Sequence, residues 1–179
     1  IEANGQALHY RLTPPAATQG KHPTIVYVYG GPGAQKVRRD WGKLLVQMFA
    51  QQGYGVLEID NRGSTNRGRL FEACLYKSMG SIEVDDQVLG LSVLTHEPWA
   101  DLERVGVFGH SYGGYMSLMC LCRAGKYFKA GVAVAPVADW QLYDSHYTER
   151  FMGLPDKDAE AYAASSIIPH LPNLERPLL

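Results

Sequence analysis

A serine stands between two patterns of different period in the stretch VGVFGHSYGGYMSLM, residues 105–119. An apolar run typical of a buried strand ends at Gly109, and the apolar spacing of a helix resumes after Ser111. Residues 109–113, Gly-His-Ser-Tyr-Gly, fit G-x-S-x-G, a turn that raises a serine hydroxyl above a strand end and onto a helix N-terminus. The pattern predicts Ser111 as a nucleophile, and the alternative is an incidental serine in a glycine-rich turn.

A serine hydroxyl attacks a carbonyl efficiently only when a base accepts its proton and donors stabilise the resulting oxyanion. The backbone N–H of Tyr112, which follows the serine at the expected helix N-terminus, is the first candidate donor. A second donor is expected from the loop Tyr-Gly-Gly-Pro-Gly at residues 29–33, because glycines let a loop approach the reacting carbonyl closely. The alternative for this loop is a tight turn with no part in catalysis.

Three aromatic residues follow the next apolar run with a spacing that would align them. Trp140, Tyr143 and Tyr147 stand at i, i+3 and i+7, which predicts one face of a helix. Because this helix would begin just after the strand next to the nucleophile, the rings would line a slot beside Ser111. Such a stripe also occurs in ordinary core packing, so the spacing alone leaves both interpretations open.

The elements that must position these residues alternate along the chain. Apolar runs typical of buried strands occupy residues 24–30, 54–60, 104–110 and 130–136, and helical spacing occurs over residues 41–49, 88–94 and 115–121. Apolar strands separated by helices predict a mostly parallel sheet with helices on both faces, the α/β class. Residues 7–12 alternate and are expected to form an antiparallel edge strand. The final residues resemble the start of another strand, so we expect the natural polypeptide to continue.

Composition limits the classes of partner. The chain has 179 residues, 46% of them hydrophobic, which suits one domain with a well-developed core. Seventeen Lys and Arg against 18 Asp and Glu leave a formal charge of −1, so neither nucleic acid nor an anionic membrane is expected as a partner. No apolar stretch approaches the ~20 residues that cross a bilayer. Cys74, Cys120 and Cys122 are expected to be packed thiols, and neither a metal nor an organic cofactor is implied.

Six segments have a more specific character: VYGGPGAQ, DNRGSTNRGRLFE, EVDDQ, GHSYGGY, AVAPVADW and YDSHYTERFMGLP. In this order they resemble the catalytic domain of the dipeptidyl peptidase IV branch of the prolyl oligopeptidase superfamily. The resemblance runs from about residue 23 to the last residue. It implies an α/β-hydrolase fold and a serine peptidase that releases N-terminal dipeptides ending in proline or, less readily, alanine.

The resemblance also implies roles for individual residues. Ser111 is the implied nucleophile, and the Tyr29 hydroxyl and the Tyr112 backbone N–H are the implied oxyanion hole. The wall of the pocket for the proline ring is implied to consist of the Tyr112 ring and four further residues, Val137, Trp140, Tyr143 and Tyr147. A phenol on a rigid ring is a chemically suitable oxyanion donor, although Tyr29 could equally be a buried sheet residue.

The remaining catalytic groups are not evident within the chain. In α/β-hydrolases the catalytic acid and histidine follow the serine in sequence, and the resemblance puts both after residue 179. Asp139, His146 and His170 are the available substitutes, and no complete triad is expected among them. Residues 1–179 are therefore interpreted as a partial α/β-hydrolase catalytic domain that is inactive by itself. The resemblance implies that the whole protein also has an N-terminal β-propeller.

Other charged residues of the matched segments are expected to support the framework. Arg62 and Arg67 are expected to pair with acids such as Glu83 or Asp86. By the same resemblance the full-length protein is expected to act on peptides and to form a homodimer. The sequence leaves the compartment open, because unpaired thiols fit either the cytoplasm or the periplasm. Two alternatives stay open: another α/β-hydrolase, such as a carboxylesterase or acylaminoacyl peptidase, and a catalytically silent binding module.

Overall fold

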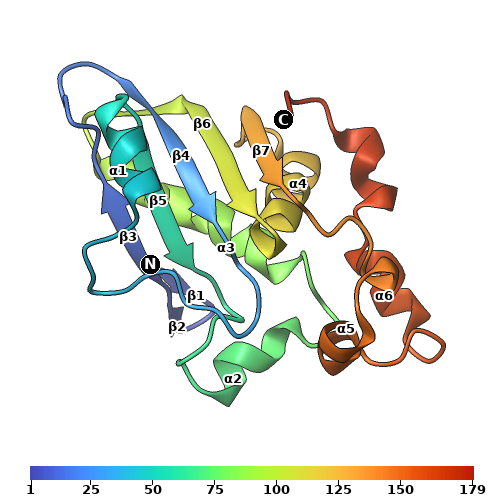
Figure 1. Ribbon diagram of the computed structural model, residues 1–179. Coiled ribbons are helices and arrows are strands. Elements are labelled where there is room, and N and C mark those ends of the chain that lie inside the picture. Colours follow the sequence, from blue (N-terminus) through green and yellow to red (C-terminus); the bar gives the residue numbers. More distant parts are fainter.

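A five-stranded sheet organises the protein, which is described here by a computed structural model of residues 1–179 (Figure 1). The strand order is β3-β5-β4-β6-β7, with the bounds β3 His9–Thr13, β4 His22–Val28, β5 Gly55–Asp60, β6 Ala100–His110 and β7 Ala130–Val134. β5, β4, β6 and β7 pair in parallel, whereas β3 is antiparallel to β5 at one edge. The mostly parallel sheet and the antiparallel edge strand are thus confirmed. A short hairpin of β1 (Glu2–Ala3) and β2 (Gln6–Ala7) precedes β3.

Six α-helices accompany the sheet: α1 Leu44–Gln51, α2 Arg69–Glu72, α3 Ile82–Gly90, α4 Tyr112–Ala124, α5 Ser145–Met152 and α6 Ala159–Ser165. Short 3-10 helices lie at Ala73–Leu75, Leu91–His96, Trp140–Leu142 and Ile168–Asn173. α1 lies on one face of the sheet, while α3 and α4 lie on the other, and α5 and α6 lie beyond the carboxyl end of β7 (Figure 1). The predicted α/β class with helices on both faces is therefore confirmed.

Helix α4 is the central helix of the core. All of its 13 residues are buried except Arg123. It packs against β6 and β7 of the sheet and also against α3 and the 3-10 helix at Ile168–Asn173. Since a helix that is apolar all round is stable only when enclosed, tertiary burial holds α4 in place. Its Cys120 and Cys122 are buried and unpaired, as expected.

Helix α1 begins later than the apolar spacing over residues 41–49 predicts. It starts at Leu44, and Trp41 lies outside it with 90% of its surface exposed. Gly42 has a φ of 78°, and its N–H donates to the Asp40 carboxylate at 2.9 Å. This local turn, which a left-handed glycine and an aspartate favour, delays the helix by three residues relative to Trp41.

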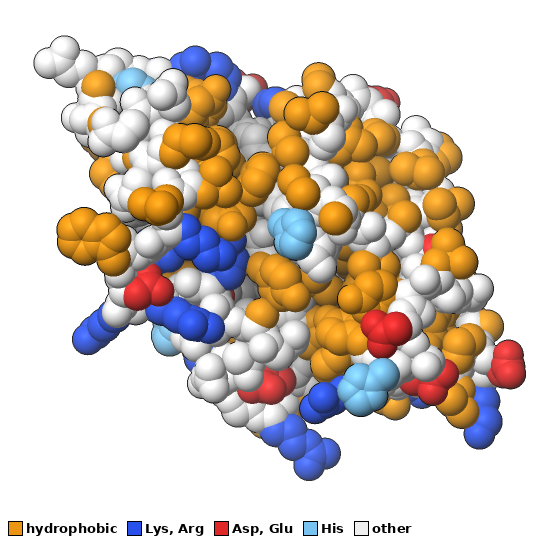
Figure 2. Space-filling view, viewed as in Figure 1, with side chains coloured by type: hydrophobic (Ala, Val, Ile, Leu, Met, Phe, Trp, Pro, Cys, Tyr) orange, Lys and Arg blue, Asp and Glu red, His pale blue; other side chains and the backbone are white.

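The face of the sheet beside α1 is hollowed. A groove of about 560 Å³ runs over β4, β6 and β7, with a lining that includes Phe49, Tyr54, Phe108 and Val132. Figure 2 shows hydrophobic side chains gathered on this side of the molecule. None of the candidate catalytic or pocket residues lines this groove.

The last residues of the chain add to the free edge of β7. The Gly131 N–H donates to the Pro177 carbonyl at 3.0 Å, and the Leu179 N–H donates to the Gly131 carbonyl at 3.0 Å. Leu178 forms a parallel bridge with Gly131. The predicted start of another strand is therefore confirmed, in the parallel direction. None of the helices combines the length and the apolar character that crossing a membrane requires.

Candidate active site

Ser111 occupies the turn between the end of β6 and the start of α4. Its φ of 60° and ψ of −118° lie in a region that residues with a side chain rarely adopt. The Ser111 N–H donates to the Val134 carbonyl at 2.9 Å, and the Ser111 carbonyl accepts the Tyr115 N–H at 3.0 Å. Hydrogen bonds from the serine turn to β7 and to the first turn of α4 therefore maintain a backbone conformation that an isolated peptide would not favour.

The glycines around Ser111 are required by close backbone contacts. A Cβ at Gly109 would overlap the backbone of Gly113, and a Cβ at Gly113 would overlap the carbonyl of Val28. A Cβ at Gly114 would lie 2.8 Å from the Val134 carbonyl oxygen. These glycines are needed because the first turn of α4 lies directly against the ends of three strands.

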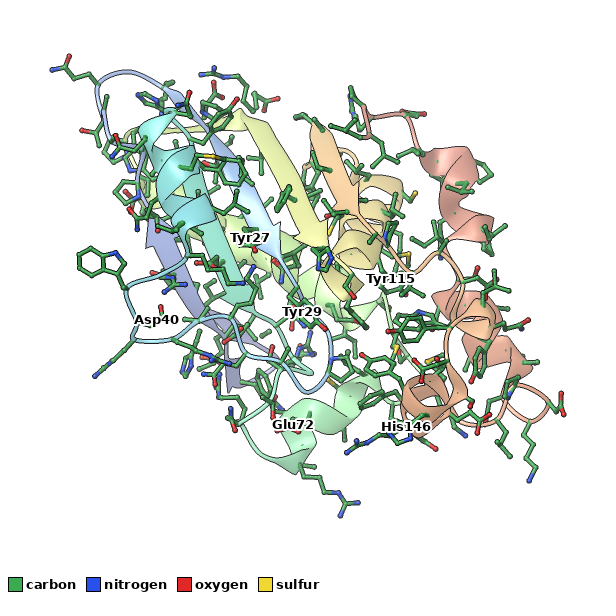
Figure 3. The ribbon with its side chains drawn as sticks, in the orientation of Figure 1. Tyr27, Tyr29, Asp40, Glu72, Tyr115 and His146 are labelled. Atoms are coloured by element: carbon green, nitrogen blue, oxygen red, sulfur yellow. The ribbon has the colours of Figure 1, made fainter.

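The Ser111 side chain is partly exposed, and its hydroxyl makes no capping hydrogen bond to α4. No triad forms around it from the available substitutes. Asp139 caps the following 3-10 helix by accepting the Gln141 N–H at 2.9 Å. His146 is exposed on α5, and His170 lies half-buried in the last 3-10 helix (Figure 3). No cluster of three His, Cys, Asp or Glu side chains in the chain is arranged to hold a metal ion.

Tyr29 lies half-buried at the carboxyl end of β4, where the strand leads into the glycine loop (Figure 3). Its ring centroid is 6.0 Å from that of Tyr112. Burial, with a smaller contribution from Tyr143, raises the pKa of Tyr29 above the usual value of 10.0. The hydroxyl therefore stays protonated at neutral pH and is available as a hydrogen-bond donor.

Tyr29 also borders a cavity of about 280 Å³ next to the serine turn, whose lining includes Tyr27, Lys36, Lys43 and His110. The Lys36 amine lies over the ring of Tyr27 and 3.8 Å from Oε1 of Glu58. Burial lowers the pKa of Lys36 to about 7, against the opposing attraction of Glu58. One side of the Tyr29 loop therefore carries a buried amine whose charge depends on pH near neutrality.

The Tyr112 ring lies beneath the serine turn. Only 2% of the residue is exposed, and its hydroxyl donates a 2.6 Å hydrogen bond to Oε1 of Glu83. A Cβ on Gly31 would lie 2.6 Å from Cγ of the ring, so the loop that carries Tyr29 rests directly on Tyr112. As the first residue of α4, Tyr112 has a backbone N–H without an acceptor inside the helix.

The prediction that one helix carries Trp140, Tyr143 and Tyr147 is wrong. Trp140 belongs to the 3-10 helix at Trp140–Leu142, and Tyr143 has an extended backbone. Helix α5 starts afresh at Ser145, where the Asp144 carboxylate accepts the Tyr147 N–H at 2.9 Å. Asp-Ser is a strong helix-start signal, and it outweighs the continuous ring spacing.

The three rings nevertheless meet in one cluster. Their centroids are 6.0 Å apart for Trp140 and Tyr143, 6.1 Å for Trp140 and Tyr147, and 5.6 Å for Tyr143 and Tyr147. Trp140 is 1% exposed and also contacts Tyr112 at 5.4 Å, so it lies behind the other rings. Tyr143 is 44% exposed, while Tyr147 and Val137 are half-buried. The structure thus arranges the predicted pocket residues from a buried indole outward to an exposed phenol.

Sequence reasoning missed two contacts of this cluster. The Phe151 ring lies 4.9 Å from that of Tyr147, and its i+4 spacing from Tyr147 on α5 could have indicated this. Glu83 was expected only as an arginine partner, yet it accepts the Tyr112 hydroxyl. Glu83 stands among other polar residues of α3, Asp85, Asp86 and Gln87, so no signal in the sequence marks it for such a contact.

The framework arginines behave differently from each other. Arg62 forms the expected ion pair with Asp86, with 2.6 Å between Nη2 and Oδ1. Arg67 instead donates to the Ala7 carbonyl at 2.6 Å and lies over the ring of Phe71. The prediction that Arg67 pairs with an acidic residue is therefore wrong. A backbone carbonyl of the β2 segment takes the place of a carboxylate.

Comparison with known proteins agrees with this geometry. Residues 42–179, which include Ser111 and the aromatic cluster, match the model of the prolyl oligopeptidase family. Dipeptidyl peptidase 8 of Mus musculus is 44% identical over 151 residues, which cover 82% of this chain and 17% of that protein. Dipeptidyl peptidase 4 of Trichophyton equinum is 35% identical over 161 residues, which cover 88% of this chain and 21% of that protein.

A solved structure shares the fold in detail. The crystal structure of Porphyromonas gingivalis dipeptidyl peptidase 4 matches with a TM-score of 0.89 and 39% identity, covering 96% of this chain and 25% of that one. The chain thus spans a quarter or less of the length of these three relatives. The family match extends over most of the chain and includes the strained serine turn. The chain therefore belongs to the prolyl oligopeptidase family.

Proposed function

We propose that this chain is the nucleophile-bearing part of a serine peptidase that releases Xaa-Pro, and less readily Xaa-Ala, dipeptides from peptide N-termini. The observation that carries the proposal is the strained turn at Ser111, with the Tyr29 loop and the aromatic cluster both packed against Tyr112. Relatives named dipeptidyl peptidases support the same reaction. In this proposal residues 1–179 form a partial α/β-hydrolase catalytic domain of the whole enzyme.

The proposed reaction proceeds through an ester on the serine. Oγ of Ser111 attacks the carbonyl carbon of the second substrate residue while a base accepts the hydroxyl proton. The carbonyl oxygen becomes an oxyanion, which the Tyr29 hydroxyl and the Tyr112 N–H stabilise by hydrogen bonds. The C–N bond then breaks, the proton passes to the leaving amine, and the dipeptide stays bound to Oγ. Water hydrolyses this ester, releases the dipeptide and restores the serine hydroxyl.

The base is proposed to come from another part of the protein. Asp139 is occupied in a helix cap, and His146 is exposed on α5. We propose that a histidine and the acid that orients it lie outside residues 1–179, in the chain order serine, acid, histidine. This chain covers only a small part of the length of its relatives, which supports this part of the proposal.

The aromatic cluster suits a proline ring in the second substrate position. Tyr143, Tyr147 and Val137 present apolar surface, and the buried Trp140 supports the two phenol rings from behind. Rings that pack against one another restrict each other's orientation, so the apolar surface that they present suits a flat, compact ring.

Hydrolysis of Gly-Pro-p-nitroanilide by the full-length protein and its Ser111→Ala variant tests the proposal. The variant is expected to lose at least about 10⁴-fold in kcat, because the reaction has no other nucleophile. A fluorophosphonate is expected to label Ser111 in the unmodified protein. Equal turnover by both proteins contradicts the proposal, faster cleavage of acyl esters than of Xaa-Pro amides favours an esterase, and an unlabelled serine without turnover indicates a silent binding module.

The full-length protein is further proposed to form a homodimer. The support for this proposal is the resemblance to the dipeptidyl peptidase IV branch. Light scattering during size-exclusion chromatography measures the mass directly, and a mass of one chain across the accessible concentration range contradicts the proposal.

A further inference from the structure

Helix α3 directs three polar side chains into the interior behind the candidate active site. Glu83, Asp86 and Gln87 are each at most 1% exposed, although charged residues are almost never fully buried without partners. Asp86 pairs with Arg62. Glu83 contacts Tyr112 directly, and Gln87 is connected to the loop after Tyr29 through Asn61. Because these two segments carry the proposed oxyanion donors, the inference below rests on the proposed function.

Glu83 holds the side chain of Tyr112. Its Oε1 accepts the Tyr112 hydroxyl at 2.6 Å and the Gly80 N–H at 2.9 Å, and its Oε2 accepts the Ser81 N–H at 3.0 Å. Burial raises the pKa of Glu83, and these donors oppose that rise. Because the Tyr112 ring is rigid, an anchored hydroxyl at one end restricts the backbone N–H at the other.

Gln87 holds the loop after Tyr29 through one intermediate residue. Nε2 of Gln87 donates to Oδ1 of Asn61 at 2.9 Å, and Nδ2 of Asn61 donates to the Gly30 carbonyl at 2.9 Å. Gln87 and Asn61 are completely buried, so water does not compete for these bonds. Gly30 has a φ of 81°, a left-handed conformation in which the carbonyl can point toward Asn61. The loop that follows Tyr29 is thereby connected to α3 by two hydrogen bonds.

We propose that Glu83 and Gln87 are positioning residues for the oxyanion hole, Glu83 through the Tyr112 hydroxyl and Gln87 through Asn61 and Gly30. The two residues stand at i and i+4 on one face of α3, so a single rigid helix sets the positions of both donors. The position of each donor matters because an oxyanion donor acts only at about 2.7–3.1 Å from the oxyanion oxygen. A small displacement of either donor weakens the transition state more than the bound substrate.

Three variants of the full-length protein test this role with Gly-Pro-p-nitroanilide as substrate. Glu83→Gln weakens the first connection, because an amide nitrogen replaces one of the two carboxylate oxygens that accept the Tyr112 hydroxyl and the N–H groups of Gly80 and Ser81. Gln87→Met removes the second connection, and both variants change the side-chain volume little. Asp85→Asn is the control, because it changes an exposed carboxylate of the same helix that contacts neither donor segment nor Asn61. We expect kcat to fall about tenfold or more for the first two, with KM changed less than about threefold, and kcat of the control to stay within about threefold.

Two further measurements separate positioning from structural support. A dipeptide boronic acid ending in boroproline forms a tetrahedral adduct on serine, and its affinity is expected to fall in proportion to kcat in Glu83→Gln and Gln87→Met. Tyr112→Phe removes the hydroxyl but keeps the ring and the N–H. If Glu83 acts through that hydroxyl, adding Glu83→Gln to Tyr112→Phe causes no further loss of kcat.

Several results would overturn the inference. These are unchanged kcat in Glu83→Gln, Gln87→Met or Tyr112→Phe, additive losses in the double variant, and a loss in Asp85→Asn as large as in the others. Thermal unfolding of each variant verifies that folded protein is assayed, and Tyr112→Phe alone decides the first connection if Glu83→Gln does not fold. If the wild-type protein leaves Gly-Pro-p-nitroanilide intact, the proposed function is contradicted, and this inference with it. If the wild-type protein is active but the variants give the results above, only this inference fails.

Discussion

The rings of Trp140 and Tyr147 stack with their centroids 6.1 Å apart and an interplanar angle of 23°, although the two residues lie in different helices. The Trp140 ring also lies 5.4 Å from that of Tyr112 and 5.2 Å from that of Tyr115 on α4. The same indole therefore forms part of the core and supports the candidate pocket. The contribution of Trp140 to stability can be compared with that of an exposed tryptophan in the same chain, Trp41.

Replacement of Trp140 by alanine is expected to reduce the free energy of unfolding by about 3–5 kcal/mol, because a fully buried ring is replaced by a cavity. Trp41→Ala is the matched control, since Trp41 is 90% exposed and its loss is expected to cost no more than about 0.5 kcal/mol. Urea unfolding of both variants measures the difference. Similar losses in the two variants would show that the Trp140 indole does not stabilise the core.

Replacement of Tyr29 by phenylalanine is expected to lower kcat on Gly-Pro-p-nitroanilide by about 10²-fold or more, the usual effect of removing one oxyanion donor. KM is expected to change little, because the hydroxyl acts on the oxyanion and not on the bound substrate. Tyr27→Phe, two residues earlier on β4, is the control and should retain most of the activity. Wild-type kcat in Tyr29→Phe would exclude the phenol as a donor.

Replacement of Lys36 by methionine is expected to alter the pH dependence of stability. Burial lowers the pKa of Lys36 from 10.5 to about 7, so between about pH 7 and 10.5 the unfolded chain binds a proton that the folded protein lacks. The stability contribution of Lys36 therefore rises with pH through this range. The stability advantage of Lys36→Met over the wild type should be largest near pH 7 and below, and should shrink as the pH approaches about 10.

Urea unfolding of both proteins at about pH 6.5, 8 and 9.5 measures this difference. Lys43→Met removes an exposed amine from the lining of the same cavity and gives the reference for losing a surface charge. An advantage of Lys36→Met that is constant with pH, or that grows toward alkaline pH, would contradict a depressed pKa at Lys36.

Steric contacts around single turns and the periodicity of apolar residues determine the parts of the structure that the sequence predicts. Gly109 and Gly113 stand two residues on either side of Ser111, so the contacts that require them belong to one turn and to the strands that the apolar runs mark. The edge strand and the final residues beside β7 follow from similarly local patterns. The ring spacing from Trp140 to Tyr147 was misleading for the same local reason, because Asp144 caps a new helix within it.

The sequence by itself determined the α/β order of elements and the turn at Ser111, because each depends on residues close together in the chain. Only the tertiary structure decided that Trp140 lies behind the other rings and that Glu83 and Tyr112, 29 residues apart, share a hydrogen bond. A polar side chain reveals neither its burial nor its partner through local spacing. Both depend on which distant segments the fold brings into contact, since a buried carboxylate is stable only where such segments supply its donors.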